Sequence, residues 1–321
     1  MTNTKVTAGV DLGGTKIQTV VVRDHEVAGS CRVLTPQAGA AAAVIEAIAG
    51  TIREALQGAG ADSADLAGIG IGTPGEVDSA SGAVSRAANV PGFSERVELG
   101  PLLSQALGGV QVTVDNDVRV GVLGEHRRGA GRPYRDLLGV WVGTGVGGGL
   151  VLGGELREGR GVAGEIGHVV VVPGGRLCSC GRHGCLEAYA GRTSMERRAR
   201  SLVDRGHKTD LFRIMEKKGR DRLSSGVYAA SLERGDRMTE RLIRDAAWAL
   251  GVAIASAQNL VDVEAVIVGG GLGDRLGQPF VDRVVEEMTP HIFASDMPPK
   301  VLATELADLA GAVGAAVLAG G

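Results

Sequence analysis

The sequence lacks an excess of positive charge, a long hydrophobic run and more than a few cysteines. It carries 34 Lys and Arg residues against 37 Asp and Glu residues, a formal net charge of −3, which argues against binding to nucleic acid or to an anionic membrane. No uninterrupted apolar stretch reaches the roughly 18 residues that a membrane-spanning helix needs. The N-terminal residues lack the charged and then apolar pattern of a signal peptide. For a chain of 321 residues, we therefore expect a cytoplasmic protein of about two domains.

Glycine, in contrast, is abundant, at 52 residues. The glycines gather in short loops between apolar segments, without the fixed repeat of collagen or the low complexity of a linker. Buried strands are predicted over residues 6–10, 17–22, 66–71, 110–114, 137–142 and 263–268, and helices over residues 40–56, 99–107, 118–128, 242–260 and 309–318. The pattern predicts an α/β protein in which glycine loops let the backbone approach a ligand closely.

The first glycine loop is Asp11-Leu12-Gly13-Gly14-Thr15-Lys16. Strand-like runs flank it on both sides, so it is predicted to be a tight hairpin. A dinucleotide-binding fingerprint would need a helix after the glycines, and the spacing of a Walker A loop is absent. An acidic residue, glycines and a hydroxyl in a hairpin are able to hold phosphate and metal through backbone N–H groups. An ordinary Gly-Gly hairpin turn is the alternative.

A second hairpin is predicted over residues 143–149, where five of seven residues are glycine and the strand resumes at Leu150. Consecutive backbone N–H groups without Cβ atoms favour binding of an anion such as a nucleotide phosphate. The two hairpins look like two copies of one structural motif in a duplicated chain. A further glycine cluster at residues 269–273 follows a strand, where a flat ligand would fit.

The polar cluster Asp115-Asn116-Asp117 stands at the carboxyl end of a predicted strand and before a predicted helix. Ligands of open α/β sheets bind outside the carboxyl ends of strands. Helix capping is the ordinary role of Asp or Asn at such a place, and it stays open for Asp115 and Asn116.

Three of the four cysteines, Cys178, Cys180 and Cys185, fall within eight residues, and His168 lies ten positions upstream. Three thiolates and one imidazole form a Cys3His set, which is typical of a closed structural zinc site. A disulfide is the alternative, but three cysteines leave one unpaired and nothing indicates an oxidising compartment. His183, inside the same loop, competes with His168 as the fourth ligand, and His168 is preferred.

Taken in order, these motifs resemble the ROK family (repressors, open reading frames, kinases). The resemblance covers nearly the whole chain and rests on the first glycine loop, Asn116-Asp117, residues 143–149, Glu165-Ile166-Gly167-His168 and Cys178-x-Cys180-Gly181-x-x-Gly184-Cys185-Leu186-Glu187. It implies a duplicated actin-like ATPase (ribonuclease H-like) fold with two lobes and a central cleft. The small lobe would be residues 1–118, joined by a C-terminal helix at about residues 303–321. Residues 119–302 would form the large lobe, with the zinc loop and a helical cap.

The resemblance also implies roles for individual residues. Asp117 would be the general base that accepts the proton of a sugar hydroxyl. The sugar would be bound by Asn89, Asn116, Asp117, Glu165, His168 and Glu187. ATP would be bound by Asp11, Gly13, Gly14, Thr15, Lys16, Gly143, Thr144, Gly145, Gly147, Gly270 and Gly271, with Asp11 near Mg²⁺ and the last two beside the adenine. Structural Zn²⁺ would be held by His168, Cys178, Cys180 and Cys185, with the other ring nitrogen of His168 facing the sugar.

The implied activity is ATP-dependent phosphorylation of an aldohexose at its 6-hydroxyl, glucose to glucose 6-phosphate. Kinases of N-acetylmannosamine, N-acetylglucosamine, fructose, allose or a cyclitol are the enzymatic alternatives. Phe93, where many family sugar kinases carry Trp, weakens any specific sugar assignment. The donor is open as well, because polyphosphate-using relatives exist, although they generally lack the cysteine loop.

A non-catalytic sugar sensor is the alternative from another class. Asp117 speaks against it, as do the only ten residues before Asp11, which leave no room for the helix-turn-helix of the family's repressors. The family resemblance also implies a homo-oligomer, either a dimer or a tetramer.

Overall fold

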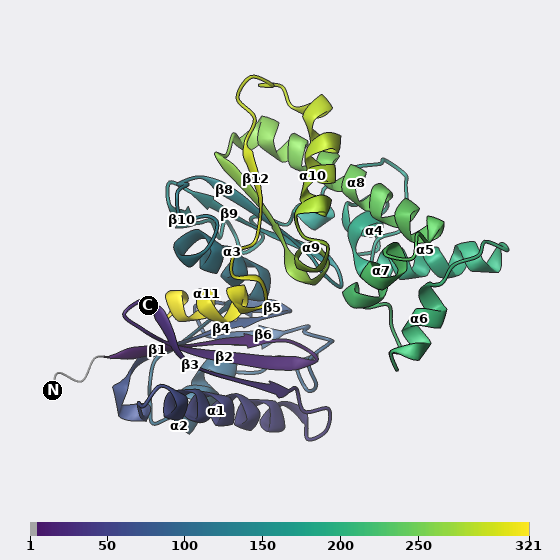
Figure 1. The fold of residues 1–321 in the computed structure, drawn as a ribbon. Helices are drawn as coiled ribbons and strands as arrows, with labels where there is room; N and C mark the ends of the chain where they lie inside the picture. The colour runs from purple at the N-terminus through teal and green to yellow at the C-terminus, as the bar shows by residue number, and fades with distance from the viewer. Residues whose placement is uncertain (1–4, 321) are drawn as a thin grey trace. The chain divides into compact units, whose positions relative to one another are not determined.

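A computed structural model describes residues 5–320, and the chain divides into two compact units (Figure 1). The first unit runs to Arg132 and also includes the C-terminal residues from Leu309 onward. The second unit is Pro133–Asp308. Within the described residues, no helix has both the length and the apolar character required to cross a bilayer.

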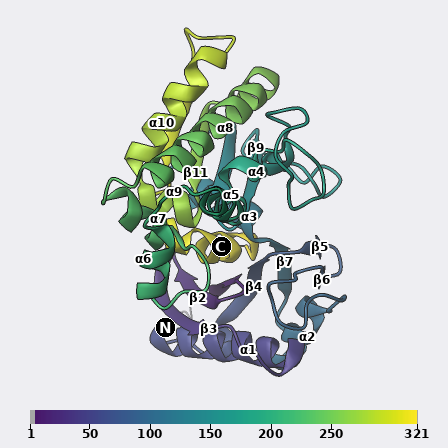
Figure 2. The ribbon, with the colours of Figure 1, turned by 90° about the vertical axis from the view of Figure 1, so that its right-hand side faces the viewer.

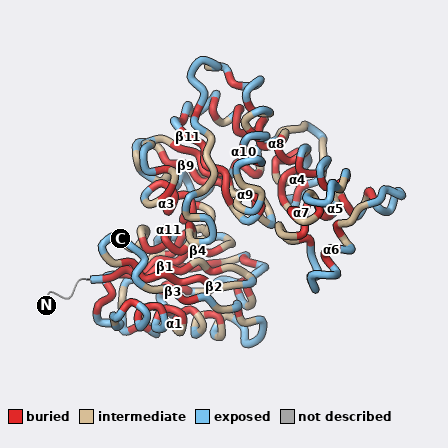
Figure 3. The backbone as a smooth tube through the Cα atoms, viewed as in Figure 1, coloured by how far each residue is buried: buried red, intermediate tan, exposed pale blue. Residues whose placement is uncertain are grey.

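The first unit is built on a five-stranded sheet with the order β3-β2-β1-β4-β7. β1 runs antiparallel to β2 and parallel to β4, and β7 is parallel to β4. The strands β1, β2 and β4 are buried along almost their whole length, as expected for a sheet that is covered on both faces (Figure 3). The strand bounds are β1 Val6–Leu12, β2 Lys16–Arg23, β3 Glu26–Leu34, β4 Leu66–Thr73 and β7 Val112–Asn116, and a small hairpin is formed by β5 Glu76–Asp78 and β6 Ala83–Ser85.

Helices cover the two faces of this sheet (Figures 1 and 2). On one face lie α1 (Ala40–Gly58) and α2 (Leu99–Ala106), and α1 buries Val44, Ile48 and Ile52, which recur at helical spacing. On the other face lie α3 (Asp117–Arg128) and α11 (Ala310–Leu318). The short 3₁₀ helix Ser63–Asp65 leads into β4.

Glycines let α11 lie directly on the strands. A Cβ atom on Gly9 of β1 would be 2.0 Å from the carbonyl oxygen of Ala312, and one on Gly70 of β4 would be 1.8 Å from that of Ala315. Gly314 of α11 approaches α3 equally closely, since its Cβ would be 1.8 Å from the carbonyl oxygen of Val120. The close packing of α11 on the strands and on α3 therefore depends on these glycines.

The second unit repeats the sheet of the first. Its strand order is β10-β9-β8-β11-β12, in which β8 is antiparallel to β9 and parallel to β11, and β12 is parallel to β11. Two sheets with the same order and the same directions confirm the predicted duplication of an α/β fold. The strand bounds are β8 Leu137–Val142, β9 Val146–Leu152, β10 Glu155–Leu156, β11 Ala265–Gly269 and β12 Lys300–Ala303.

The longest helix of this unit, α8 (Arg237–Val261), is buried along one side and runs beside α10 (Gln278–Met288) (Figure 2). The segment between the cysteines and α8, which was expected to form a helical cap, is largely helical. Its helices are α4 Glu187–Ala190, α5 Arg192–Asp204, α6 Leu211–Lys217 and α7 Ser225–Leu232. The remaining elements are α9 Gly270–Leu276 and the 3₁₀ helices Ile166–His168, Thr289–His291 and Ala307–Leu309.

Candidate active site and metal centre

In the first unit, strand register gathers polar residues at one edge of the sheet. Asp11 of β1 pairs with Gly72 of β4, and Gly72 pairs with Asp115 of β7, so the three residues form one row across the sheet. The first glycine turn follows Asp11, and Asn116 and Asp117 follow Asp115. The structure therefore brings the first glycine turn and the predicted base to the same edge of this sheet.

Asn116 and Asp117 open helix α3. The side-chain oxygen of Asn116 accepts hydrogen bonds from the backbone N–H groups of Val118 (3.0 Å) and Arg119 (3.3 Å), which confirms the capping role that the sequence left open. Asp117 is the first helical residue, and its Oδ1 accepts from the N–H of Val118 at 2.9 Å. The helix start thus fixes the backbone on which the partly exposed Asp117 carboxylate is carried.

Asp115 has a different environment from Asp117. It is only 3% exposed, and its carboxylate forms an ion pair with Arg119 one turn later at 3.2 Å. Its Oδ1 also accepts from the N–H of Asn116 at 2.7 Å. Buried and paired in this way, Asp115 supports the strand–helix junction, and the neighbouring Asp117 is the more accessible of the two carboxylates.

The first glycine turn is closed by local hydrogen bonds. The N–H of Gly13 donates to the carbonyl of Lys16 (3.0 Å), and the hydroxyl of Thr35 donates to the carbonyl of Gly13 (2.6 Å). A Cβ atom on Gly14 would be 2.2 Å from the carbonyl oxygen of Asn89. The contact with the Asn89 backbone is enough to require glycine at position 14. The same contact places the exposed Asn89 beside the turn.

In the second unit, the strand resumes after the second glycine turn at Val146, four residues earlier than the sequence predicted. Gly147 lies within β9 opposite Trp141, and only residues 143–145 form the turn, closed by a hydrogen bond from the N–H of Gly143 to the carbonyl of Gly145 (2.9 Å). A Cβ atom on Gly148 would be 2.4 Å from the carbonyl oxygen of Gly164. On Gly143 it would meet no described atom within 4 Å, so the turn is open at this position.

Glu187 connects this turn to the cysteine loop, residues 178–185. Its Oε2 accepts from the N–H of Val146 at 3.1 Å, and a Cβ atom on Gly145 would be 2.3 Å from the same oxygen. Its Oε1 accepts from the hydroxyl of Ser179 and from the thiol of Cys178, the latter at 3.6 Å. One carboxylate therefore contacts both elements that the sequence assigned to ligand binding.

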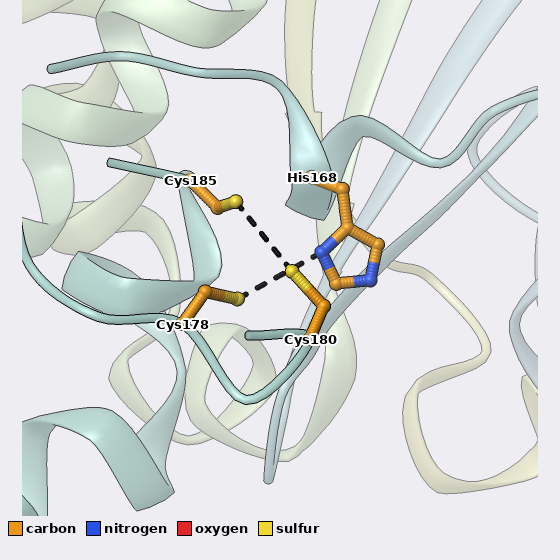
Figure 4. A group of neighbouring side chains, drawn as sticks. All are labelled: His168, Cys178, Cys180 and Cys185. Carbon is orange, nitrogen blue, oxygen red and sulfur yellow. Dashed lines mark hydrogen bonds between the residues drawn. The ribbon is translucent and has the colours of Figure 1, made fainter. Parts of the chain in front are cut away.

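The four predicted metal ligands come together where the cysteine loop meets His168 (Figure 4). The side-chain ligand atoms of His168, Cys178, Cys180 and Cys185 all lie within 4.8 Å of one another. Cys178 Sγ is 3.8 Å from His168 Nδ1, and Cys180 Sγ is 3.8 Å from Cys185 Sγ. Zn–S bonds of about 2.3 Å in a tetrahedron separate two sulfurs by about 3.8 Å, so the donor set fits zinc.

The structure also distinguishes between His168 and His183, the two candidates for the fourth metal ligand. The Nδ1–H of His183 donates to the carbonyl of Gly175 at 2.9 Å, and His183 is not part of the ligand group. All four cysteines are free thiols, which is against the disulfide alternative. In Figure 4 the second ring nitrogen of His168 points away from the sulfurs.

Backbone geometry explains how the loop brings its cysteines together. An antiparallel bridge joins Leu177 to His183, and the N–H of Cys178 donates to the carbonyl of Arg182 at 2.8 Å. Gly181 and Gly184 have φ values of 82° and 84°, which suit glycine. The loop is thus a tight hairpin that turns its thiols inward.

The thiols differ in burial and in acidity. Burial raises the pKa of Cys178 to about 12, whereas the backbone N–H of Arg182 lowers that of the exposed Cys180. A buried thiol beside the Glu187 carboxylate keeps its proton unless a cation displaces it. Binding of a metal ion would therefore require the Cys178 thiol to lose its proton.

Glu165 immediately precedes the 3₁₀ helix Ile166–His168, which ends at His168 and packs against the start of β9. A Cβ atom on Gly167 would be 1.9 Å from the carbonyl oxygen of Val146, so glycine is required there. Glu165 is exposed, and its carbonyl accepts from the N–H of His168 at 3.1 Å. This contact places both residues close to the second glycine turn.

Gly270 and Gly271, expected to form a loop beside adenine, are instead the first residues of helix α9. Gly270 has a φ of 79°, and a Cβ atom on it would be 2.7 Å from the backbone nitrogen of Val142. Val142 immediately precedes the second glycine turn. The expected loop conformation is wrong, because the chain begins a helix as soon as β11 ends.

Comparison with known proteins adds independent findings. A model of the ROK family matches residues 7–321. The chain is 34% identical to a glucokinase of Thermotoga maritima over 96% of this chain and 95% of that protein. It is 32% identical to the bifunctional enzyme NanE/NanK of Brucella melitensis over 96% of this chain and 53% of that protein. A solved ROK family glucokinase from Streptomyces griseus, in complex with glucose and AMPPNP, superposes with a TM-score of 0.79 at 33% identity, covering 98% of this chain and 99% of that chain.

Proposed function

Because the chain belongs to the ROK family and is a sugar kinase with the duplicated actin-like fold of that family, we propose that it transfers the γ-phosphoryl group of ATP to the 6-hydroxyl of glucose. The observation that carries the proposal is the similarity, over almost the whole chain, to glucokinases, one of them solved with glucose and an ATP analogue. The start of α3 supports it, because Asp117 is held there by a capped helix terminus.

In this mechanism Asp117 is the general base. It accepts the proton of the 6-hydroxyl as that oxygen attacks the γ-phosphorus, while the bond to the bridging oxygen of ADP breaks. Phosphoryl transfer asks for positioning and charge stabilisation more than for covalent chemistry. The rigid junction of β7 and α3 meets the first requirement on the side of the base.

The two glycine turns would bind the nucleotide. Backbone N–H groups and side chains of the first turn and of the second would contact the phosphates, and α9 would lie beside the adenine. Mg²⁺ neutralises phosphate charge when it is bound, and Asp11 would hold it through water. The proposed nucleotide-binding residues are Asp11, Gly13, Gly14, Thr15, Lys16, Gly143, Thr144, Gly145, Gly147, Gly270 and Gly271.

Polar side chains would bind the sugar hydroxyls. Asn116 uses its amide oxygen as a helix cap, so its amide nitrogen is the group available to a hydroxyl. Glu187 and His168 contact the cysteine loop through one part of each side chain, and structural zinc there would orient both toward the sugar. The remaining proposed sugar ligands are Asn89 and Glu165.

The test is a coupled assay of ADP release with ATP and Mg²⁺ against glucose, mannose, fructose, glucosamine, N-acetylglucosamine and N-acetylmannosamine. We expect turnover on glucose, and loss of turnover with retained glucose binding in Asp117→Asn. Full activity of the variant would contradict the assignment of the base. Turnover on an acetamido sugar alone would keep the mechanism and change the substrate, and sugar binding without any transfer would favour a sensor.

Two further properties belong to this proposal. ATP and reduced thiols occur together in the cytoplasm, where we place the reaction. We also expect a homo-oligomer, dimer or tetramer, which light scattering of the purified protein would distinguish.

A further inference from the structure

Arg192, the first residue of α5, is bound to the second glycine turn by both its main chain and its side chain. Its backbone N–H donates to the carbonyl of Gly143 at 3.1 Å, and its Nη2 donates to the hydroxyl of Thr144 at 3.0 Å. The N–H of Thr193 donates to the carbonyl of Thr144, also at 3.1 Å. The helix start and the guanidinium therefore sit on a turn that is proposed to bind phosphate.

The charge of Arg192 has no partner within the described part of the chain. The side chain forms no ion pair there, and its Nε is buried without an acceptor. A guanidinium has five N–H donors, and the contact with Thr144 uses only one of them. Burial lowers the pKa of Arg192, and the nearby Arg222 lowers it further although Tyr228 opposes this. A partly desolvated cation of this kind is costly unless an anion completes the site.

The neighbouring arginines Arg200 and Arg222 share a carboxylate partner, in contrast to Arg192. Arg222 donates from Nε to Glu196 Oε2 at 3.0 Å, and Arg200 donates to Glu196 Oε1 at 2.8 Å. Glu196 is 5% exposed, so this carboxylate is committed to the two arginines. Among these three arginines, Arg192 is the one whose guanidinium has no carboxylate partner in the described part of the chain.

Two more features of the turn favour an anion as its partner. The α5 helix has 13 residues, and its N-terminus, the positive end of its dipole, faces the turn. The N–H groups of Arg192 and Thr193 already donate to turn carbonyls, so the donors for a ligand would come from the Arg192 guanidinium. The space beside Gly143 is open to the approach of one.

From this arrangement we infer that Arg192 is a phosphate-binding residue of the kinase, which contacts the phosphate oxygens of ATP and stabilises the negative charge that develops on the transferred phosphoryl group. The inference rests on the proposed function. The planar guanidinium suits phosphate because two parallel N–H groups bind two oxygens. Thr144 and the helix start hold the guanidinium in place before the nucleotide arrives.

The experiment compares Arg192→Ala and Arg192→Lys with Arg205→Ala, a control at the exposed C-terminal end of the same helix. Calorimetry with AMPPNP and Mg²⁺, and separately with adenosine, measures nucleotide affinity without any sugar. We expect Arg192→Ala to weaken AMPPNP binding by about 10- to 100-fold, the range for hydrogen bonds to charged groups, and to leave adenosine binding unchanged. Arg192→Lys should recover part of the loss, and Arg205→Ala should match the wild type.

A second measurement separates binding of phosphate from support of the turn. Added guanidinium ion should restore part of the turnover of Arg192→Ala and have no such effect on the wild type. Equal AMPPNP affinity in Arg192→Ala and the wild type, or equal losses of AMPPNP and adenosine binding, would overturn the inference. A wild type that binds AMPPNP but phosphorylates none of the sugars would overturn the proposed glucokinase activity instead, and the calorimetric comparison would still decide the role of Arg192.

Discussion

Two glycines of the second turn should respond to the same substitution in opposite ways. Gly143 and Gly145 are two residues apart and neither has a positive φ, so alanine is compatible with the backbone at both positions. Their surroundings differ. A Cβ atom at position 143 would meet nothing described within 4 Å, whereas one at position 145 would be 2.3 Å from Glu187 Oε2.

The magnitudes follow from these contacts. Gly145→Ala must displace the Glu187 carboxylate by about 1 Å to reach ordinary van der Waals separation. The displacement breaks the hydrogen bond from the N–H of Val146 to Glu187, which is 3.1 Å long and has a charged acceptor. Such a bond contributes about 1.5–3 kcal/mol to the free energy of unfolding. Gly143→Ala should instead stabilise by about 0.4–1 kcal/mol, because it restricts only the unfolded chain.

Equilibrium unfolding of the two variants in urea, without ligands, measures this difference directly. We expect the midpoint to fall for Gly145→Ala and to stay or rise for Gly143→Ala. Steady-state kinetics should show a raised KM for glucose in Gly145→Ala, because Glu187 moves, and a raised KM for ATP in Gly143→Ala, because the methyl group enters the phosphate site. Equal unfolding midpoints for the two variants would refute the reasoning about the turn.

Two other predictions concern the second unit. Cys180→Ser should lose zinc and raise the KM for the sugar through the loop that adjoins Glu187, whereas His183→Ala should retain the metal; metal analysis of both proteins checks this, and a zinc-free wild type would contradict it. Burial opposes ionisation of Glu196, but hydrogen bonds from Arg200, the backbone of Leu223 and Arg222 outweigh it and lower the pKa. The stability contributed by Glu196 is then present above its unfolded pKa of about 4.3 and is lost as pH falls through the lower folded pKa. Glu196→Gln should therefore cost about 1–3 kcal/mol at neutral pH and progressively less as the pH falls below the unfolded pKa of about 4.3, and a cost that does not change with pH would contradict this.

Much of the fold could be predicted because its signals are local. Apolar runs bounded by glycine mark β1, β4, β8 and β11, and the spacing of Val44, Ile48 and Ile52 marks α1. The strands β3 and β12 were not predicted. Eight of the nine residues of β3 are exposed or partly exposed without a regular alternation, and β12 has only four residues. Both lie at sheet edges, where pairing with a neighbour decides the structure more than composition does.

The candidate site also has features that could be predicted from the sequence and features that could not. The cysteine loop was predictable because the ligands of a Cys3His set lie close together in the sequence. Only the choice between His168 and His183 needed the structure. The reasons for individual glycines were not predictable. Gly14 is fixed by Asn89, and Gly145 by Glu187, each of them more than forty residues away in the chain.

Arg192 shows why a motif search stops short of the whole site. In the sequence it is one of many arginines in the segment expected to form the helical cap, outside every predicted site. Composition does not distinguish it from Arg200 or Arg222, and only the structure shows that those two share the Glu196 carboxylate whereas Arg192 lies on the turn. A residue whose function depends on the absence of a counter-charge has no sequence signature of its own. Its role is therefore best tested by ligands that differ in charge, as AMPPNP and adenosine do.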